Sequence, residues 1–562
     1  MARIIECVPN FSEGRDLDVI KQITAQAETV EGVRLLDVDP GQATNRTVVT
    51  LAGEPDAVVE AAVRCARQAA DLIDMRRHKG EHPRFGALDV CPLVPVAGIT
   101  MEETVAYART LARRLGEEVG LSVFLYEHAA LIEERRNLAT VREGEYEALP
   151  DRLADPRWKP DFGPAEFNDR SGATAVSARD FLVAFNVNLN TTSTRRANAI
   201  AFDVRERGRV KRTGDPLLGE PVLDENGERV WTPGSLKCVK GIGWYIEEYG
   251  IAQISLNLTN ISVTPVHVAF DEVCRKADAR GVRVTGSELV GLIPLEAMLE
   301  AGRYFLRKQQ RSTGVADREL IRLAAKSMGL DELTPFRPDE KIVEYALEDR
   351  SRKRLVDLSL QGFVEETASE SVAPGGGSVA AAVGALGAAL AAMVANLSSH
   401  KRGWDDRWEE FSAWAEQGKA AYAELIALVD RDTDAFNAIM AAFRLPQGSG
   451  EEKTARHAAI QAATRQAIEV PLRVMEVAAA SMEVISAMVE TGNPSSVTDA
   501  AVGALCARSA VMGAFLNVKV NAVDLEDKAA VQAYRARGEE LEAQTLEKER
   551  AILALTQTRL DA

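Results

Sequence analysis

Hydrophobic positions along the chain change their spacing near residue 350. Before this point, short runs of β-branched and aromatic residues alternate with stretches in which apolar residues recur every three or four positions. This alternation is typical of layered α/β or α+β domains. From residue 355 onward, Ala, Leu, Met and Glu dominate at helical spacing, and the alternation that marks strands almost disappears. The pattern predicts a multidomain protein in which two α/β (α+β) subdomains precede an all-α bundle of about six or seven helices.

The first subdomain is expected to span residues 1–178. Its pattern predicts strands over residues 4–9, 33–38, 46–52, 87–96 and 122–126, and helices over residues 57–74 and 102–119. Pro92 and Pro95 lie inside the fourth of these strands. Because proline has no N–H to donate to a sheet, the two residues favour an edge position for this strand.

The second subdomain is expected to span residues 179–330. Its pattern predicts strands over residues 181–189, 252–258 and 282–285, and helices over residues 195–207, 266–279 and 295–306. The segment 208–235 is rich in glycine, proline and charge, which predicts a long loop or a small hairpin. Prolines and a charged stretch indicate a linker over residues 331–354, so that the helical domain would span residues 355–562.

Length, charge and cysteine content limit the classes of function. A chain of 562 residues is too long for one hydrophobic core. Its formal charge of -17 argues against a general nucleic-acid binder, because any basic surface must be local. The six cysteines show no C-x-x-C spacing, which indicates free thiols in a reducing compartment and no zinc motif. The N-terminus lacks the pattern of an export signal, and we expect a cytoplasmic protein.

The run from Val379 to Ala395 contains no charged residue and is nearly long enough for a membrane helix. It consists mostly of alanine and glycine rather than leucine, isoleucine and phenylalanine. Small residues suit helices that pack closely within a bundle. We therefore expect a bundle helix and no membrane partner.

The segment from Arg77 to Val90 places His82 in a loop crowded with cations. His82 precedes a proline, which disfavours helical backbone, and a strand is expected after it. Four cations lie close to it in sequence: Arg76, Arg77, Lys79 and Arg84. Their charge should keep the imidazole neutral near pH 7 and able to accept a proton. The segment indicates a general base, with a surface histidine in a basic turn as the alternative.

Three glycines precede the alanine-rich helical stretch: Gly375, Gly376 and Gly377. Glycine lets the backbone approach a ligand closely, and the N–H groups at a helix start attract carboxylate or phosphate. Ser378 follows and can cap the helix. The segment matches neither a Walker loop nor G-x-G-x-x-G, so nucleotide binding is not supported. A flexible turn at a tight helix crossing is the alternative.

Asp432 lies in a predicted helix, and its neighbours three and four positions away are apolar on both sides. A carboxyl group turned toward the bundle interior should have a raised pKa through desolvation, which suits proton transfer. A buried aspartate that only hydrogen-bonds a neighbouring helix is the alternative.

The segment from Lys237 to Trp244 combines cations, glycines and an aromatic residue. Together with residues 161–172 it can line a groove for a flat heterocycle, or it can simply join strands.

Taken in order, these motifs closely resemble the bifunctional formiminotransferase-cyclodeaminase family over nearly the whole chain. The residues that carry the resemblance are 6–14, 44–48, 77–90, 144–150, 241–245, 373–379 and 428–430. The resemblance implies a transferase module of two α/β subdomains and a helical cyclodeaminase module. It implies that His82 is the transferase acid/base and that Asp432 is the cyclodeaminase carboxylate.

The resemblance also implies that residues 163–172 and 234–243 contribute to the binding of tetrahydrofolate. The candidate folate-binding residues in these two segments are Gly163, Pro164, Gly172, Gly234, Lys237, Lys240, Gly241, Ile242 and Gly243. The segment around residues 208–234 looks longer than in the animal proteins. From their charge, we assign Arg46 and Arg84 to the carboxylates of the first substrate. We assign residues 375–378 to binding in the second module.

The implied function belongs to histidine degradation. The formimino group passes from N-formimino-L-glutamate to tetrahydrofolate, and the product then cyclises to 5,10-methenyltetrahydrofolate with release of ammonia. We expect a polyglutamylated folate, no metal, no nucleic-acid partner and a homo-oligomer. One alternative is a transferase module that uses N-formylglutamate. Another is a helical module that only binds folate or mediates oligomerisation.

Overall fold

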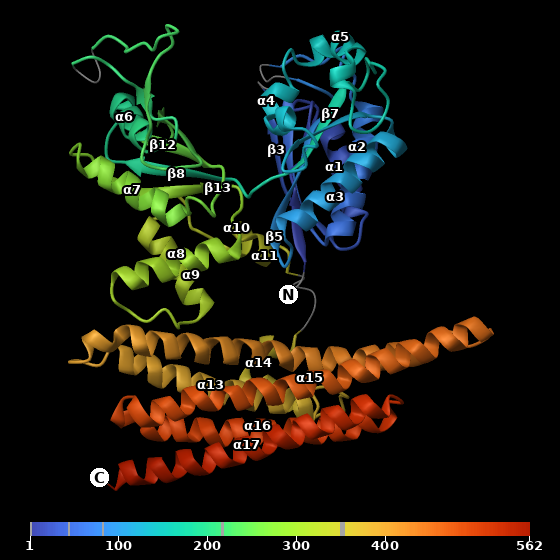
Figure 1. Ribbon diagram of the computed structural model, residues 1–562, viewed down its shortest axis with the longest axis vertical. Helices are drawn as coiled ribbons and strands as arrows, with labels where there is room; N and C mark the ends of the chain where they lie inside the picture. The colour runs from blue at the N-terminus through green and yellow to red at the C-terminus, as the bar shows by residue number, and fades with distance from the viewer. Residues whose placement is uncertain (1–2, 43–44, 81–83, 215–218, 349–353, 562) are drawn as a thin grey trace. The chain divides into compact units, whose positions relative to one another are not determined.

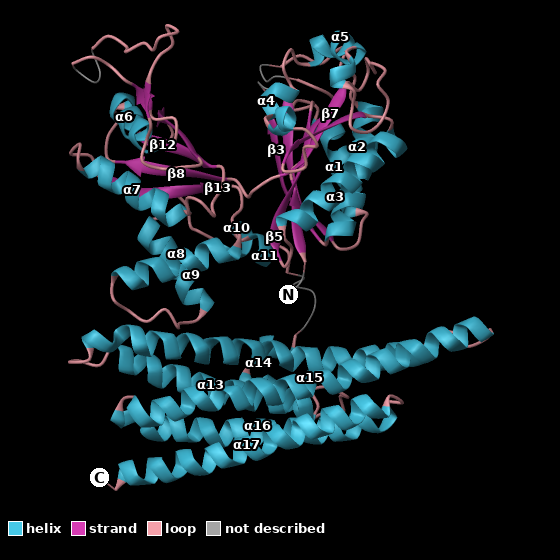
Figure 2. Ribbon diagram, viewed as in Figure 1, coloured by secondary structure: helices cyan, strands magenta, loops and turns pink. Residues whose placement is uncertain are grey.

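The computed structural model describes residues 3–42, 45–80, 84–214, 219–348 and 354–561 (Figure 1). The chain divides into two compact units. The first, called the α/β unit, consists of Met1–Ala301 and Ala324–Glu348, and the second, called the helical unit, of Gly302–Leu323 and Asp349–Ala562. Within the described ranges, all strands belong to the α/β unit (Figure 2). The change of architecture near residue 350 that the sequence predicts is therefore confirmed.

The first sheet of the α/β unit contains seven strands. These are β1 (Ile4–Cys7), β2 (Asn10–Phe11), β3 (Val33–Gly41), β4 (Arg46–Gly53), β5 (Leu88–Ala97), β6 (Ser122–Glu127) and β7 (Ala173–Ala178). Their order is β1-β4-β2-β5-β7-β6, and β3 pairs with β4. Three helices pack against this sheet: α1 (Leu17–Glu28), α2 (Pro55–Leu72) and α3 (Met101–Arg114). Of these elements, the sequence analysis missed α1, β2 and β7.

The edge position expected for β5 is wrong, because β5 lies inside the sheet between β2 and β7 and also pairs with β1. Two interruptions of its neighbours accommodate the prolines. β1 ends at Cys7 and β2 begins at Asn10, so the antiparallel partner is broken opposite Pro92, whose carbonyl accepts the Val8 N–H at 3.1 Å. β7 ends opposite Leu93, before Pro95 is reached. A proline is tolerated where no partner needs its N–H.

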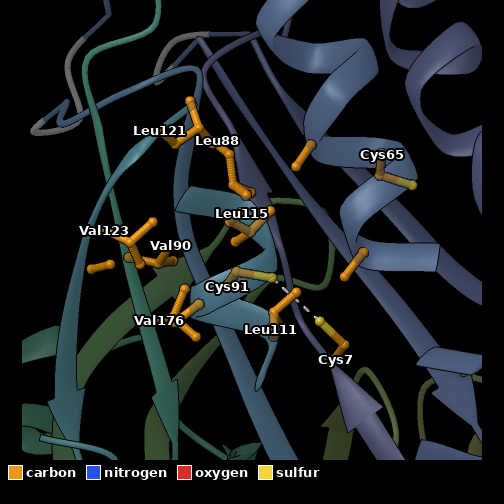
Figure 3. Packing of buried hydrophobic residues seen from close by; sticks show 14 of the residues in the cluster. Cys7, Cys65, Leu88, Val90, Cys91, Leu111, Leu115, Leu121, Val123 and Val176 are labelled. Atoms are coloured by element: carbon orange, nitrogen blue, oxygen red, sulfur yellow. Dashed lines mark hydrogen bonds between the residues drawn. The ribbon is translucent and has the colours of Figure 1, made fainter. Parts of the chain in front are cut away.

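The core of this sheet contains Cys7, Cys65 and Cys91, which are fully buried (Figure 3). The Sγ atoms of Cys7 and Cys91 lie 3.5 Å apart, in hydrogen-bond contact and without a disulfide. Burial raises the pKa of the Cys65 thiol to about 12. All six cysteines are free thiols, as the sequence predicts.

The second sheet of the α/β unit is antiparallel with the order β11-β12-β8-β13. Its strands are β8 (Val183–Leu189), β11 (Val239–Ile246), β12 (Ile251–Leu258) and β13 (Val284–Val290), and the helices α6 (Thr194–Val204) and α7 (Val266–Asp278) pack against it. The sequence analysis did not expect β11 as a strand, because Gly241 and Gly243 interrupt its pattern. A Cβ on Gly243 would lie 2.3 Å from the Asn198 nitrogen in α6, so glycine allows the helix to approach the strand.

The segment 208–235 contains a small hairpin in which β9 (Arg209–Val210) pairs with β10 (Trp231–Thr232). A hairpin was one of the two possibilities expected from the sequence.

The residues expected as a linker are partly structured. Residues 331–348 belong to the α/β unit and include α10 (Pro338–Lys341) and α11 (Val343–Ala346). Ile342 forms a β-bridge with Ile293, and the Glu344 carboxylate accepts the Leu295 N–H at 2.7 Å.

The helical unit is built mainly of long helices. From residue 355 onward the described chain forms α12 (Leu360–Thr367), α13 (Gly376–Ser399), α14 (Trp408–Phe443), α15 (Gly450–Thr491), α16 (Val497–Asn521) and α17 (Lys528–Leu560). Helix α13 contacts α14, α15 and α16. Two helical segments in the described residues, 376–399 and 494–524, are long and apolar enough to cross a membrane. In α13, 61% of the most apolar stretch is buried inside the protein. Packing within the bundle therefore accounts for the absence of charged residues from this helix.

Candidate active sites

The α/β unit contains a cleft with a volume of about 850 Å³. Residues of both sheets and of the loops between them line it. Asn10 and Val90 come from the first sheet, and Lys240 comes from β11. Arg142 and Arg179 add two further cations to the wall. The cleft is large enough for a folate-sized heterocycle with an anionic tail.

His82 lies in residues 81–83, outside the described part of the chain, but both ends of its loop are described. At the first end, the Asn45 side chain donates to the Lys79 carbonyl at 3.0 Å and accepts the Gly14 N–H at 3.0 Å. At the second end, the Tyr146 N–H donates to the Arg84 carbonyl at 2.8 Å. Tyr146 directly follows Gly144 and Glu145, which line the cleft. The base of the loop is therefore attached to the wall of the cleft.

Arg84 binds the loop itself. One of its terminal nitrogens donates to the Met75 carbonyl at 2.9 Å and to the His78 carbonyl, while Nε donates to Glu147 at 3.0 Å. The guanidinium also lies 4.7 Å from the centre of the Tyr146 ring. These contacts favour a role in holding the loop, whereas the sequence analysis assigned Arg84 to a substrate carboxylate.

The sequence analysis missed His78, which is buried beside this loop. Its Nε2 lies 2.7 Å from the Asn45 carbonyl oxygen, so Nε2 carries the proton and donates it to that oxygen. Burial lowers the pKa of His78, and the charge of Arg84 lowers it further. A neutral ring leaves Nδ1 as an acceptor, and that atom is buried with no hydrogen-bond partner among the described residues. His78 is thus a neutral imidazole in the part of the loop nearest Asn45.

Arg46, the other arginine assigned to a substrate carboxylate, belongs to a cluster with Asp89 and Arg142. Its Nη1 lies 2.8 Å from the Asp89 carboxylate, and Arg142 contacts the same carboxylate oxygen. Arg46 Nε also donates to Asn10 Oδ1 at 2.9 Å. Asn10 and Arg142 line the cleft, so the cluster lies at its wall. Sequence analysis could not find Asp89 and Arg142, because only the fold brings them to Arg46.

In the first candidate folate segment, the glycines are packed closely against backbone. Gly163 has a φ of +80°, and a Cβ there would lie 1.9 Å from the Leu121 carbonyl oxygen. The Pro164 carbonyl accepts the Ser122 hydroxyl at 2.7 Å. Gly172 has a φ of +66°, and a Cβ there would lie 2.4 Å from the Phe85 carbonyl oxygen, just past the loop that carries His82. Both glycines are needed for backbone packing, and Gly172 also adjoins the loop that carries His82.

In the second candidate segment, Lys240 lines the cleft. Along β11 the exposed residues alternate with buried glycines, so Lys240 and Ile242 share the exposed face while Gly241 and Gly243 lie underneath. Gly234 packs against the Arg205 carbonyl, where a Cβ would approach to 2.1 Å. Lys237 is exposed and lies 3.8 Å from Glu206. Of the candidate folate-binding residues in this segment, Lys240 lines the cleft, and Cys238 of the same segment lines it as well.

In the helical unit, Asp432 of α14 faces the first turn of α13. Its Oδ2 accepts the Ser378 hydroxyl at 3.0 Å. Burial raises the pKa of the Asp432 carboxyl, and the hydrogen bonds from Ser378 partly oppose that shift. The expected orientation toward the bundle interior and the expected direction of the pKa shift are both confirmed. By contrast, the neighbouring Asp430 accepts the Leu355 N–H at 2.7 Å and holds the chain entering the bundle.

The three glycines at the start of α13 differ in what surrounds them. Gly375 is the N-cap, so the capping role expected for Ser378 is wrong. Ser378 lies inside the first turn, where its hydroxyl points to Asp432 instead. A Cβ on Gly377 would lie 2.2 Å from Asp432 Oδ1, whereas Gly375 has open space around it. Gly377 is therefore required for the contact between the helix start and the carboxylate.

A pocket with a volume of about 120 Å³ opens beside this carboxylate. Gly375, Gly376 and Asp432 line it, together with residues that the sequence analysis missed: Phe436, Asn517 and Asn521. A Cβ on Gly376 would lie 3.4 Å from Asn517 Nδ2, so the amide faces the glycine turn. The pocket combines one proton-transfer group with neutral amides and an aromatic ring, which suits a heterocycle.

The described residues contain no group of three or more His, Cys, Asp or Glu side chains that could hold a metal ion. In the pocket of the helical unit, Asp432 has a raised pKa, which suits the transfer of protons between nitrogen atoms of a bound substrate.

Three family models match nearly the whole chain. They are described as the formiminotransferase domain, N-terminal subdomain (residues 4–179), the formiminotransferase domain (residues 184–348) and formiminotransferase-cyclodeaminase (residues 359–540). The chain is 42% identical over 563 residues to a formimidoyltransferase-cyclodeaminase from Sus scrofa, with 100% of this chain and 99% of the relative covered. It is 42% identical to the protein of that name from Rattus norvegicus, with 96% of each chain covered.

A glutamate formimidoyltransferase from Streptococcus pyogenes serotype M1 is 39% identical over 307 residues. The match covers 55% of this chain and 94% of the relative. A protein with about half the length of this chain thus matches along nearly all of its own length.

Proposed function

The chain belongs to the formimidoyltransferase-cyclodeaminase family, and we propose that its two units carry out two successive folate reactions at the two sites described above. It is an enzyme of histidine degradation with transferase and cyclodeaminase activities. The α/β unit transfers the formimino group of N-formimino-L-glutamate to tetrahydrofolate. The helical unit converts the product to 5,10-methenyltetrahydrofolate and ammonia. The observation that carries this proposal is the Asp432 carboxyl, half-buried against the first turn of α13 in a pocket otherwise lined by neutral groups.

In the transferase step, N5 of tetrahydrofolate attacks the amidine carbon of the donor, and the bond from that carbon to the glutamate nitrogen breaks. The proton lost by N5 has to reach the departing nitrogen. His82 accepts the first proton and returns it to glutamate, so the enzyme ends in its starting state. Arg84 and Asn45 hold the ends of the loop through the contacts at Met75, His78 and Lys79.

In the cyclodeaminase step, N10 attacks the formimino carbon, and the bond from that carbon to the terminal nitrogen breaks to release ammonia. The formimino group enters the step protonated, as an amidinium, so the proton on N10 completes the leaving nitrogen as neutral ammonia and the methenyl product keeps the positive charge. Asp432 carries the N10 proton, and its raised pKa brings the carboxyl closer to the range in which it can both accept and return a proton. The Ser378 hydroxyl orients the carboxylate during this transfer.

We assign the formimino group, rather than a formyl group, to the donor. The relative from Streptococcus pyogenes is named glutamate formimidoyltransferase and matches along 94% of its own length. A polyglutamylated folate fits the cations of the large cleft, which include Arg179 and Lys240. The free thiols and the folate substrate support a cytoplasmic location.

We also propose that the protein is a homo-oligomer that assembles through α13 and α16. These adjacent helices carry exposed apolar residues along one stripe each: Leu386, Met393 and Leu397 on α13, and Val502, Leu505, Met512, Leu516 and Val520 on α16. Exposed apolar residues gathered on two adjacent helices favour an interaction site. The double change L386E and L516E should lower the mass measured by light scattering, whereas L560E, which alters an exposed leucine of α17, should not. An unchanged mass for the double variant would refute this interface.

The function is tested by mixing the purified protein with tetrahydrofolate and formiminoglutamate. Methenyltetrahydrofolate absorbance and ammonia should both appear. If formylglutamate is consumed and formiminoglutamate is not, the donor is different. If H82A retains full transfer, the loop does not act as described. If D432N retains full cyclisation, the pocket of the helical unit does not act as described.

A further inference from the structure

The cluster of Arg46, Asp89 and Arg142 differs from a simple ion pair, because two guanidinium groups contact one carboxylate. Asp89 is 1% exposed and receives both guanidinium groups on the same oxygen, Oδ2. Its other oxygen, Oδ1, and the Arg142 Nε are buried with no hydrogen-bond partner among the described residues. The Arg142 Nε–H is a donor that a bound anion can use, whereas Asp89 Oδ1 is an acceptor that only a donor such as water can satisfy.

The cluster carries one excess positive charge, because two guanidinium groups share one carboxylate. Asn10 Oδ1, which also accepts hydrogen bonds from Arg46, is neutral. Burial lowers the pKa of Arg46 and the pKa of Arg142 to about 10 each, so holding both charges in the wall of the cleft is costly. Both groups remain protonated at neutral pH. A bound anion would offset the excess charge.

The position of the cluster relates it to the reacting group. Arg46 directly follows Asn45, which binds the catalytic loop at His78 and Lys79. Arg142 and Asn10 face the cleft. An anion bound here therefore lies at the cleft wall next to the base of the loop that carries His82.

We propose that Arg46 and Arg142 bind a carboxylate of the glutamyl donor, and that Asp89 positions both guanidinium groups for it. This inference rests on the transferase function proposed above. The guanidinium fork matches a carboxylate in shape and charge. In the donor, the carboxylates are only a few bonds from the amidine carbon. In folate, the glutamate carboxylates are separated from N5 by the aminobenzoyl group, so a site beside the loop suits the donor better.

The variants R142A and R46A test the proposal without burying an unpaired charge, because Asp89 keeps one guanidinium in each. We expect either change to raise the KM for formiminoglutamate about 10- to 100-fold, the cost of one charged hydrogen-bonded contact. The KM for tetrahydrofolate should stay within about twofold, and kcat at saturating donor should change little, because this contact exists before and during the reaction. R157A removes an exposed arginine of the same subdomain and should change none of these values.

Two donor analogues separate carboxylate recognition from a structural effect. One is 4-formiminoaminobutanoate, which lacks the α-carboxylate, and the other is 2-formiminoaminobutanoate, which lacks the side-chain carboxylate. For the analogue without the recognised carboxylate, R142A should cause no further loss beyond that seen with the wild type. D89N should reduce the preference for formiminoglutamate over the analogue that lacks the recognised carboxylate, while the KM for tetrahydrofolate stays at the wild-type value. A purely structural role of Asp89 would instead change both quantities.

The outcomes distinguish the possible failures. Equal losses of R142A for formiminoglutamate and for both analogues would overturn the proposal, and so would a larger change in the KM for a folate polyglutamate than for the donor. Each variant is checked for folding of the α/β unit by circular dichroism and thermal melting, which should match the wild type. If the wild type binds formiminoglutamate in calorimetry with the predicted dependence on Arg142 but transfers nothing, the proposed function fails and the carboxylate site stands.

Discussion

The two candidate sites handle charge in opposite ways. The cleft of the α/β unit contains charged groups of both signs, such as Arg46 and Arg142 around Asp89, a cluster with one positive charge in excess. The pocket of the helical unit has one carboxylate, Asp432, with a serine, amides and an aromatic ring around it. The difference follows from the substrates. A donor with two carboxylates needs cations for recognition, whereas the second step needs one proton carrier whose pKa is raised by burial.

The largest expected effect is that of D432N on the helical site. Asparagine keeps the shape of the side chain but cannot carry a proton, so cyclodeamination should fall by about 10²- to 10⁴-fold while transfer is retained.

The same variant should also change stability. Burial raises the pKa of Asp432 in the folded protein, so the contribution of this carboxyl to stability is present at low pH and is lost as the pH rises through that pKa. At neutral pH, D432N should therefore raise Tm. Calorimetry and a stopped assay of 5-formiminotetrahydrofolate measure the two effects, and a lower Tm would contradict the account.

The second effect concerns the close contact between α13 and Asp432. In G377A the new Cβ would lie 2.2 Å from Asp432 Oδ1 and would displace the carboxylate. A displacement of this size should reduce cyclodeamination about 100-fold and leave the transferase unchanged. G450A, where the added Cβ meets no atom within 4 Å, is the matched control. Equal activity of G377A and G450A would show that the glycine has no role at the site.

The helical site could be predicted from the sequence much further than the cleft. Helical spacing alone placed Asp432 on the apolar side of α14, because a helix repeats every few residues. What spacing could not show is that α16 brings Asn517 and Asn521 to the same pocket. In the cleft, Asn10, Arg46, Asp89 and Arg142 come from separate strands and a loop, and only sheet pairing brings them together. Local pattern also failed at β5, where breaks in the neighbouring strands accommodate prolines, and at β11, where glycines accommodate a helix.

The third effect is a change in pH dependence. The Ser378 hydroxyl stabilises the ionised form of Asp432, so S378A should raise the pKa of that carboxyl further above its ordinary value. Because the ionised carboxylate accepts the N10 proton, the acid limb of cyclodeamination should move to higher pH, with a loss of about tenfold on that limb. The pH profile of the transferase should not move. An acid limb that stays in place or moves to lower pH would exclude this role for Ser378.

The smallest effect is expected for R84K, which replaces the several hydrogen bonds of the Arg84 guanidinium by the single charge of a lysine. R84K keeps the charge beside the loop but cannot reach Glu147, Met75 and His78 together. We expect kcat of the transferase to fall by about tenfold with little change in the KM for formiminoglutamate, because the loop rather than the substrate is loosened. Steady-state kinetics checks this, with R157K as the control. A change confined to the donor KM would instead return Arg84 to the substrate-binding role assigned from the sequence.

The most direct test of two separate sites is to follow both steps in D432N and H82A. With formiminoglutamate and tetrahydrofolate, D432N should accumulate 5-formiminotetrahydrofolate and release no ammonia. H82A should form no intermediate from these substrates, yet it should convert added 5-formiminotetrahydrofolate to methenyltetrahydrofolate and ammonia at the wild-type rate. If D432N still releases ammonia at the wild-type rate, or H82A cannot process the added intermediate, the division of the two reactions between the α/β unit and the helical unit is wrong.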